Sequence, residues 1–342
     1  MRAARGYRHV VSTTASPPHH VPRIGLVLGG GGTTGAAFHA GTLLALEHDL
    51  GWDPRTADVV VGSSAGSIVG TLLRTGVDTD GLAAWGAQAE AQESGRDTRV
   101  LLDELEQVGY RWSPSVLRPP IPSWSLLRRM AHPGQLRMHT AAMSLLPSGW
   151  INAGASLQRL GSLAESWPDA PLWITAVRTR DARRVVFGRD RHDALLGEAI
   201  AASCAIPALF RPVEVGGERF IDGGAHSPTN ADVLVESGVD AAIVLSPMSA
   251  QDDALGRRPT HALRSLFARR LRIERAALEA AGIEVHVFEP DATTLGTMGI
   301  NALDRKRSAA VVRDAFLAAG QHVASHGRLR DVLQPAGAAR AA

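Results

Sequence analysis

Residues 59–70 constrain the fold of this chain more than any other stretch, because they place a serine between a short strand and a helix. They read Val-Val-Val-Gly-Ser-Ser-Ala-Gly-Ser-Ile-Val-Gly. Three β-branched residues predict a buried strand, and the small and apolar residues that follow predict a helix. Ser64 then stands at the apex of a sharp turn, with its hydroxyl exposed at the end of a sheet. We interpret Ser64 as a nucleophile; a plain strand-to-helix turn of small residues is the alternative.

The residues that flank Ser64 have supporting roles in this interpretation. Gly62 and Gly66 lack side chains, so the strand and the helix can pass close to each other. The N–H group of Ala65 opens the helix, where negative charge is favoured, and can face an oxyanion. The five residues Gly-Ser-Ser-Ala-Gly therefore predict both an attacking group and part of its electrostatic support.

A glycine-rich loop precedes this turn in the chain. Residues 24–28 predict a buried strand, residues 36–50 a helix, and the loop Gly29–Gly35 connects them. Since glycine has no side chain, the loop N–H groups can converge on an anion. Gly30-x-Gly32-x-x-Gly35 also matches the dinucleotide-binding fingerprint, with Asp53 near the expected acidic position. An oxidoreductase that binds a dinucleotide is therefore one alternative, although it has no use for an exposed serine.

Length and composition predict a globular α/β protein. The chain has 342 residues, of which 45% are hydrophobic, so it can bury the core of one large domain or two smaller ones. The formal net charge of +2 gives no field that would attract nucleic acid. Cys204 is the only cysteine, which excludes an internal disulfide and fits a reducing, cytoplasmic compartment. We expect its thiol to be buried by packing.

The two ends of the chain predict tails. Residues 1–22 contain no apolar run of signal-peptide length, and we expect them to be disordered. Residues 331–342 predict a frayed end, which leaves a single domain at 23–330. No stretch approaches 18 apolar residues, so we expect no spanning helix.

Residues 107–164 differ in composition from the rest of the domain. They contain no Asp or Glu but six arginines, three tryptophans and several prolines, which exclude a continuous helix. We interpret this stretch as a cap or lid inserted into the domain. Arginine with tryptophan suits an anionic lipid surface, so peripheral contact with a membrane is one interpretation of this stretch. The alternative is an ordinary surface insertion.

The remaining pattern alternates strands and helices. Strands are predicted at 172–177, 183–187, 219–222, 241–246 and 283–288, and helices at 77–106, 195–204, 260–281 and 302–325. Asp222-Gly223-Gly224 ends the third of these strands; a simple turn is the alternative for this triplet. In the helix at 260–281, Leu263, Phe267, Leu271 and Leu278 recur at the spacing of a buried face. The arginines of this helix are expected on a solvated face.

Three separated blocks carry a resemblance to the patatin-like phospholipase family. They are Gly30–Gly35, Gly62–Gly66 and Asp222–Gly224, in that order, and residues 201–213 resemble the stretch just ahead of the third block. The resemblance implies a three-layer α/β/α sandwich around a mostly parallel sheet. It also implies a Ser64–Asp222 dyad and an oxyanion hole formed by the amides of Gly30, Gly31 and Gly32. Thr34 departs from the family, which usually has Arg or Lys there, and this puts a preference for anionic headgroups in doubt.

The function implied by this resemblance is hydrolysis of acyl esters in lipids, of the phospholipase A or lipid esterase type. It requires no metal and no cofactor, and no His/Cys/Asp spacing in the sequence calls for a metal. An α/β-hydrolase with a Ser-His-Asp triad is a second alternative, with Asp222 and one of His226, His261 or His286. A silent lipid-binding protein of the same fold is a third.

Overall fold

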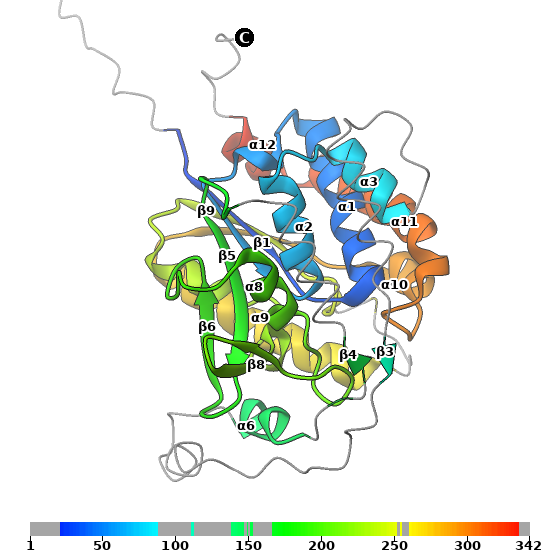
Figure 1. Ribbon diagram of the computed structural model, residues 1–342. Coiled ribbons are helices and arrows are strands. Elements are labelled where there is room, and N and C mark those ends of the chain that lie inside the picture. The colour runs from blue at the N-terminus through cyan, green and yellow to red at the C-terminus, as the bar shows by residue number, and fades with distance from the viewer. Residues whose placement is uncertain are drawn as a thin grey trace, which may run out of the picture.

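One eight-stranded sheet organises the part of the chain that the structure describes (Figure 1). The computed structural model describes residues 21–87, 111–112, 138–146, 149, 151–152, 166–251, 254 and 260–334. The order along the sheet is β10–β9–β1–β2–β5–β8–β7, and β6 pairs with β5. The strands are β1 (Ile24–Leu28), β2 (Val59–Ser63), β5 (Leu172–Arg178), β6 (Arg183–Phe187), β7 (Val213–Val215), β8 (Glu218–Asp222), β9 (Ala241–Leu245) and β10 (Glu284–Phe288).

The sheet is parallel through its centre and antiparallel at one end. Strands β10, β9, β1, β2 and β5 are parallel neighbours in that order. Strands β6 and β8 pair antiparallel with β5, and β7 pairs antiparallel with β8. Because parallel strands need crossover connections, helices cover both faces of such a sheet. The predicted three-layer α/β/α sandwich with a mostly parallel sheet is confirmed.

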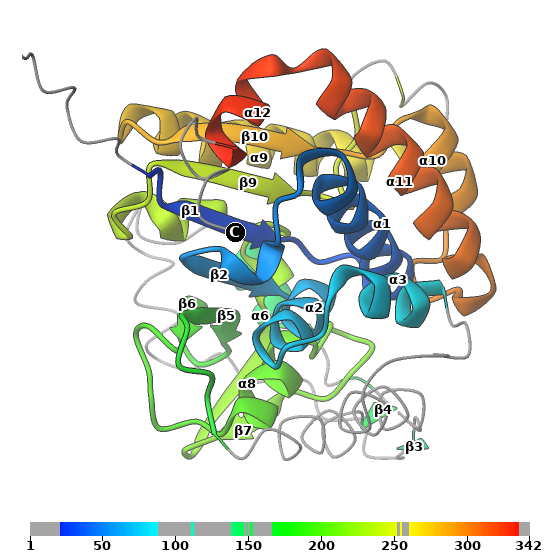
Figure 2. The same ribbon diagram turned by 90° about the horizontal axis from the view of Figure 1, so that it is seen from above.

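The two faces of the sheet bury separate apolar cores. Leu26 and Leu28 of β1 belong to the larger core, and Val27, which points to the other side, belongs to the smaller one. Helices on the first face include α1 (Gly32–Leu50), α2 (Ala65–Arg74), α8 (Leu196–Ser203) and α11 (Ser308–Ser325), and α9 (His261–Ala280) covers the second. Figure 2 shows α1, α3 (Thr79–Ala87) and α11 grouped together on one side.

Several element boundaries differ from the sequence prediction. Helix α1 begins four residues before the predicted start at residue 36, because the chain turns into the helix at Gly31 rather than after the glycine loop. Strand β7 and the helices α10 (Ala292–Met298) and α12 (Gly327–Leu333) were not predicted. The predicted domain end at residue 330 was wrong, since α12 continues past it and buries Leu333, and the side chain of Gln334 donates to the carbonyl oxygen of Leu50.

Helix α9 packs through a face that the apolar spacing did not fully predict. Leu271 and Leu278 are buried as predicted, but Leu263 is 47% exposed. Buried polar side chains take part of the face instead: Arg264 donates to the carbonyl oxygens of Pro247 and Ser249, and Glu274 accepts from the Thr229 hydroxyl at 2.5 Å. The first turn of α9 is therefore held against the loop after β9 by a buried arginine rather than by an apolar side chain.

Most of the predicted cap lies outside the described residues, as do most of the two predicted tails and the later part of the predicted helix at 77–106. Within 107–164 the described elements are the short antiparallel pair β3 (Arg111–Trp112) and β4 (Ile151–Asn152), and helix α6 (Met138–Ser144). Among the helices that the structure describes, none combines the length and the apolar character that crossing a bilayer requires.

Candidate active site

Ser64 occupies a strained turn between β2 and α2. Strand β2 ends at Ser63, helix α2 begins at Ala65, and Ser64 between them has φ 52° and ψ −121°. A non-glycine residue at positive φ is uncommon and persists only where its surroundings enforce it. The side chain stands at the carboxyl end of a central parallel strand, with 7% of the residue exposed. Ser64 therefore has the geometry of a nucleophile at a sharp strand-to-helix elbow.

Two other serines hold the elbow in this conformation. The N–H of Ser64 donates to Oγ of Ser203, at the end of α8, over 2.9 Å. Oγ and the backbone N–H of Ser67 donate to the carbonyl oxygen of Ser64 at 2.7 and 2.8 Å. Sequence reasoning missed Ser203, since a serine in a run of small helical residues carries no local sign of a partner 139 positions away.

The glycines of the elbow lie where strand and helix come closest. A Cβ on Gly66 would overlap the carbonyl oxygen of Leu28, and one on Gly62 would lie 2.6 Å from Cα of Ser67. Neither neighbour is the end of a flexible side chain, so a methyl group could be accommodated only by moving β1 or α2. These close approaches give the two glycines the steric role that the sequence suggested.

Replacing Gly66 with alanine is expected to destabilise the protein by about 3 kcal/mol or more, because the overlap with the backbone of β1 cannot be relieved by a rotamer change. Urea unfolding of the purified variant measures this loss. Gly327→Ala is the matched control, since no atom lies within 4 Å of the added Cβ. Equal stabilities for the Gly66 and Gly327 variants would contradict the close approach.

Asp222 reaches the elbow through the register of β5. Ser63 pairs with Thr175, and the next residue of β5, Ala176, pairs with Asp222 at the end of β8. The Asp222 residue is 5% exposed, and its Oδ1 accepts from the N–H of Gly224 at 2.7 Å. Burial raises the pKa of the Asp222 carboxyl to about 6, against the lowering effects of hydrogen bonds from the Ser64 side chain and from Gly224. The carboxylate is thus tuned toward a base that works near neutral pH.

The glycine loop lies beside Ser64. A Cβ on Gly30 would lie 3.3 Å from Cβ of Ser64. The N–H of Gly30, however, donates to the carbonyl oxygen of Pro228 at 2.8 Å, so the prediction that it serves as an oxyanion donor was wrong. The N–H groups of Gly31 and Gly32, at the start of α1, have no backbone acceptor among the described residues. These two amides, with that of Ala65, are the candidates for holding an oxyanion.

His39 contacts the glycine loop through its ring, and the sequence analysis did not single it out. It is fully buried on α1, and its Nε2 lies 2.7 Å from the carbonyl oxygen of Gly29. Burial lowers the pKa of His39 to about 4, so the ring is neutral at pH 7 and Nε2 carries the proton that is donated. A neutral imidazole adds no charge under the candidate oxyanion site.

Cys204 is buried next to the same site. Its Sγ lies 3.8 Å from Oγ of Ser67, and burial together with the Asp222 charge raises the pKa of the thiol to about 12. A thiol that stays protonated is a poor nucleophile. The predicted packing role of Cys204 therefore fits its surroundings.

Two of the three histidines considered for a triad lie away from Ser64. Strands β9 and β1 separate the strand of His286 from β2, and Nε2 of His286 lies 3.2 Å from Glu284. His261 is exposed at the start of α9, on the opposite face of the sheet from α2. His226 is in the turn that follows Asp222 and is half-buried.

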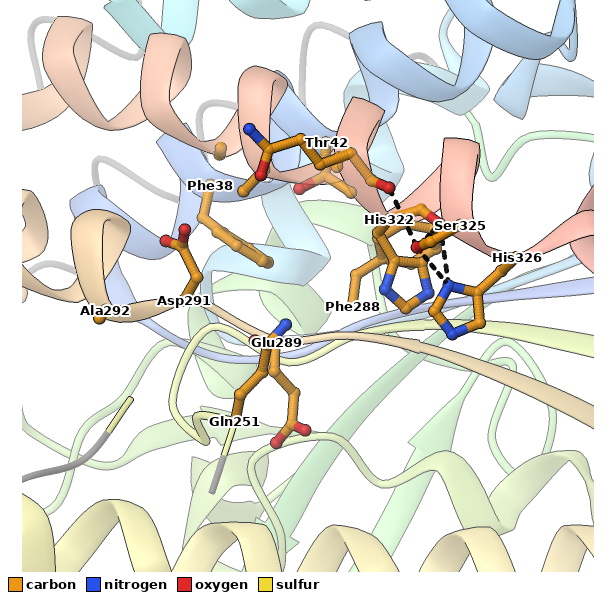
Figure 3. A pocket seen from close by; sticks show the side chains of 14 residues that line it. Phe38, Thr42, Gln251, Phe288, Glu289, Asp291, Ala292, His322, Ser325 and His326 are labelled. Atoms are coloured by element: carbon orange, nitrogen blue, oxygen red, sulfur yellow. Dashed lines mark hydrogen bonds between the residues drawn. The ribbon is translucent and has the colours of Figure 1, made fainter. Parts of the chain in front are cut away.

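A cavity of about 480 Å³ lies at another part of the sheet edge, between α1, α11 and the end of β10. Figure 3 shows Phe38, Phe288, Asp291 and the rings of His322 and His326 around it, the last two stacked with centroids 4.0 Å apart. Neither Ser64 nor Asp222 lines this cavity. No group of three or more potential metal ligands occurs among the described residues.

The comparison with protein-family models identifies one family. The sequence model described as patatin-like phospholipase matches residues 26–235, which include the glycine loop, the elbow and Asp222. The structure of VipD from Legionella pneumophila aligns over 91% of this chain and 68% of its own, with 15% identity and a TM-score of 0.41. The type III effector protein ExoU aligns over 91% of this chain and 54% of its own, with 18% identity and a TM-score of 0.36. The chain thus spans about two thirds and about half of the lengths of these two proteins.

Proposed function

The chain belongs to the patatin-like phospholipase family and is a lipid ester hydrolase, and on this premise we propose that it cleaves acyl esters with Ser64 as nucleophile and Asp222 as base. One observation supports this assignment most: a serine in a strained elbow lies beside a buried carboxyl, whose pKa burial raises to about 6 against the lowering effect of that serine's side chain. A serine at an ordinary turn requires neither a strained backbone at positive φ nor a buried carboxyl group beside it. The same pair needs no histidine.

In the first half of the reaction, Oγ of Ser64 attacks the ester carbonyl carbon while the Asp222 carboxylate accepts the hydroxyl proton. The carbonyl oxygen becomes an oxyanion, which accepts hydrogen bonds from the amides of Gly31, Gly32 and Ala65 in this proposal. Collapse of the tetrahedral intermediate expels the alcohol, which takes the proton from Asp222. The acyl group remains as an ester on Ser64.

In the second half, Asp222 accepts a proton from a water molecule that attacks the acyl-serine carbonyl carbon. The same amides hold the second oxyanion, and Ser64 recovers its proton as the fatty acid leaves. No step in this cycle requires a metal or a cofactor. A buried carboxylate suits both halves, because water exclusion strengthens its interaction with the serine hydroxyl.

The dinucleotide alternative loses its main support at the same loop. The family match spans both the glycine loop and the serine elbow, and a Cβ on Gly30 would lie 3.3 Å from that of Ser64. The amide of Gly30, which opens the fingerprint, is bonded within the protein. The loop therefore supplies two consecutive amides beside a serine, which suits an oxyanion better than a pyrophosphate.

Thr34 bears on the choice of lipid. Its N–H donates to the carbonyl oxygen of Ala302 at 3.0 Å, and its hydroxyl lies 3.4 Å from the same oxygen. Thr34 therefore holds the segment around Ala302 against α1 and brings no positive charge of its own to the glycine loop. We propose that the enzyme does not require an anionic headgroup and acts on neutral or zwitterionic lipid esters as well, in peripheral contact with the lipid surface.

Labelling with a fluorophosphonate probe, followed by peptide mapping, tests the assignment of Ser64. We expect a single modified peptide that contains residues 59–70, with the adduct on Ser64, because the probe forms a stable ester with an activated serine. Labelling of wild type should slow below about pH 6 as Asp222 is protonated. An adduct on another serine, or none under conditions of ester turnover, would contradict the proposed nucleophile.

A further inference from the structure

Asn230 lies directly beneath the two segments that carry Ser64 and Asp222. It is fully buried and begins η3 (Ala231–Glu236), a short 3₁₀ helix that follows the turn after β8. Ser63, which precedes Ser64, and Gly223, which follows Asp222, are both within hydrogen-bond distance of its side-chain amide. One side chain therefore contacts the residue next to each member of the proposed dyad.

The amide nitrogen of Asn230 faces four acceptors. Nδ2 lies 3.0 Å from Oγ of Ser63, 3.2 Å from Oγ1 of Thr175, 3.2 Å from the carbonyl oxygen of Gly223 and 2.6 Å from that of Ser227. The hydroxyls of Ser63 and Thr175 are themselves 2.7 Å apart. An amide has only two N–H hydrogens, so the group is shared among β2, β5 and the turn after Asp222. It joins three segments that are distant in sequence.

The conformation of Asn230 fixes the direction of this amide. The backbone is left-handed, with φ 53° and ψ 31°, a region that asparagine tolerates better than most residues. Its Oδ1 accepts from Nη1 of Arg184 at 3.3 Å, and Arg184 is paired with Asp232 at 2.5 Å. With the oxygen directed to a cation, the nitrogen must face the four acceptors. The network leaves one orientation for the side chain.

We propose that Asn230 is a positioning residue, which sets the separation and alignment of the Ser64 hydroxyl and the Asp222 carboxylate. The inference rests on the proposed dyad and extends it to a residue that does not touch the substrate. Ser63 and Gly223 are each adjacent in the chain to one dyad member, so a displacement at Asn230 reaches both. Proton transfer depends steeply on such alignment.

Asn230→Gly tests this role, because glycine keeps the left-handed backbone and removes only the amide. We expect kcat for a soluble p-nitrophenyl ester to fall by about 10- to 100-fold with KM changed by less than about twofold. Ala182→Gly is the matched control, since Ala182 is also buried at φ 53° but lies in the turn between β5 and β6. The control should retain the kcat of wild type.

A double-mutant cycle with Ser63→Ala separates positioning from general loss of structure. Ser63 and Asn230 share a hydrogen bond, so we expect the double variant to lose less labelling rate than the two single losses combined. Asn230→Asp adds a second test: a nearby carboxylate raises the pKa of Asp222, so the acid limb of kcat/KM should move to higher pH.

Three results would overturn the positioning role. The first is an unchanged kcat in Asn230→Gly, and the second is strictly additive effects in the double-mutant cycle. The third is a loss of activity in Asn230→Gly that equals its loss of fluorophosphonate-reactive sites, because such a loss would reflect only a smaller folded fraction. Failure of the proposed function looks different, because Ser64→Ala would then retain activity. An inactive Ser64 variant beside a fully active Asn230→Gly variant would therefore contradict only the positioning role.

Discussion

Replacing Ser64 with alanine is expected to lower kcat for a p-nitrophenyl ester by at least about 10⁴-fold, because no acyl intermediate can form without the hydroxyl. The fold should be retained. The hydrogen bond from the backbone N–H of residue 64 to Ser203 does not involve the side chain, and alanine experiences the same strain as serine at φ 52°. Initial rates of the purified variant, together with its urea unfolding curve, measure both expectations.

Ser249→Ala is the matched control for this loss. Ser249 is fully buried and its hydroxyl bonds the Ser246 segment after β9, so the substitution also removes a buried hydroxyl, but away from the elbow. Its kcat should stay within about twofold of wild type, with a stability loss of about 1 kcal/mol. Turnover by Ser64→Ala at the rate of this control would remove Ser64 from the mechanism.

The elements that were predicted correctly from sequence are those whose conformation depends mainly on the residue pattern within the segment itself. Strand β1 matches the prediction, and β2 ends directly before Ser64, because short runs of β-branched and apolar residues bounded by glycine have few other conformations. Helix α9 was predicted within one residue at each end for a similar reason. Helix α12 was not predicted, because its residues show no clear apolar spacing. It is stabilised by burial of Leu329 and Leu333, which depends on contacts that a short stretch of sequence does not reveal.

The candidate site divides in the same way. Ser64 and Asp222 come from motifs, but the contacts that bring them together come from the order of strands in the sheet, which sequence does not display. Asn230 and Ser203 were missed because a single Asn or Ser in a loop or helix looks like any other until its partners are known. At Gly30 the motif predicted too much. It suggested a free amide, but the N–H of Gly30 donates to the carbonyl oxygen of Pro228.

Replacing Asp222 with asparagine is expected to lower kcat by about 10³-fold or more, because the proton of Ser64 then has no acceptor of comparable basicity. Asparagine has nearly the same shape and can still accept from the N–H of Gly224 through Oδ1. In wild type, kcat/KM should decline as pH falls through about 6, where Asp222 becomes protonated. The residual activity of the variant should lack this acid limb.

The same substitution is expected to stabilise the protein at neutral pH. Burial raises the pKa of Asp222 to about 6 in the folded state from its ordinary value of 3.8. Between these values the folded protein holds a proton that the unfolded chain has released, so stability falls as pH rises through this window. Below it both states are protonated, and above it both are ionised. Ionised Asp222 therefore destabilises the fold by about 3 kcal/mol at pH 8 relative to its protonated form.

Asparagine cannot ionise, so the Asp222→Asn variant should gain about 2 to 3 kcal/mol over wild type between about pH 4 and pH 8. His39 has the opposite pH dependence, since its pKa is lowered to about 4, but it is common to both proteins and cancels in the comparison. Urea unfolding at the two pH values measures the difference. An inactive variant that becomes relatively more stable as pH rises would identify Asp222 as a carboxylate kept buried for its chemistry at the expense of stability. A stability difference that does not change with pH would contradict the raised pKa on which the proposed base depends.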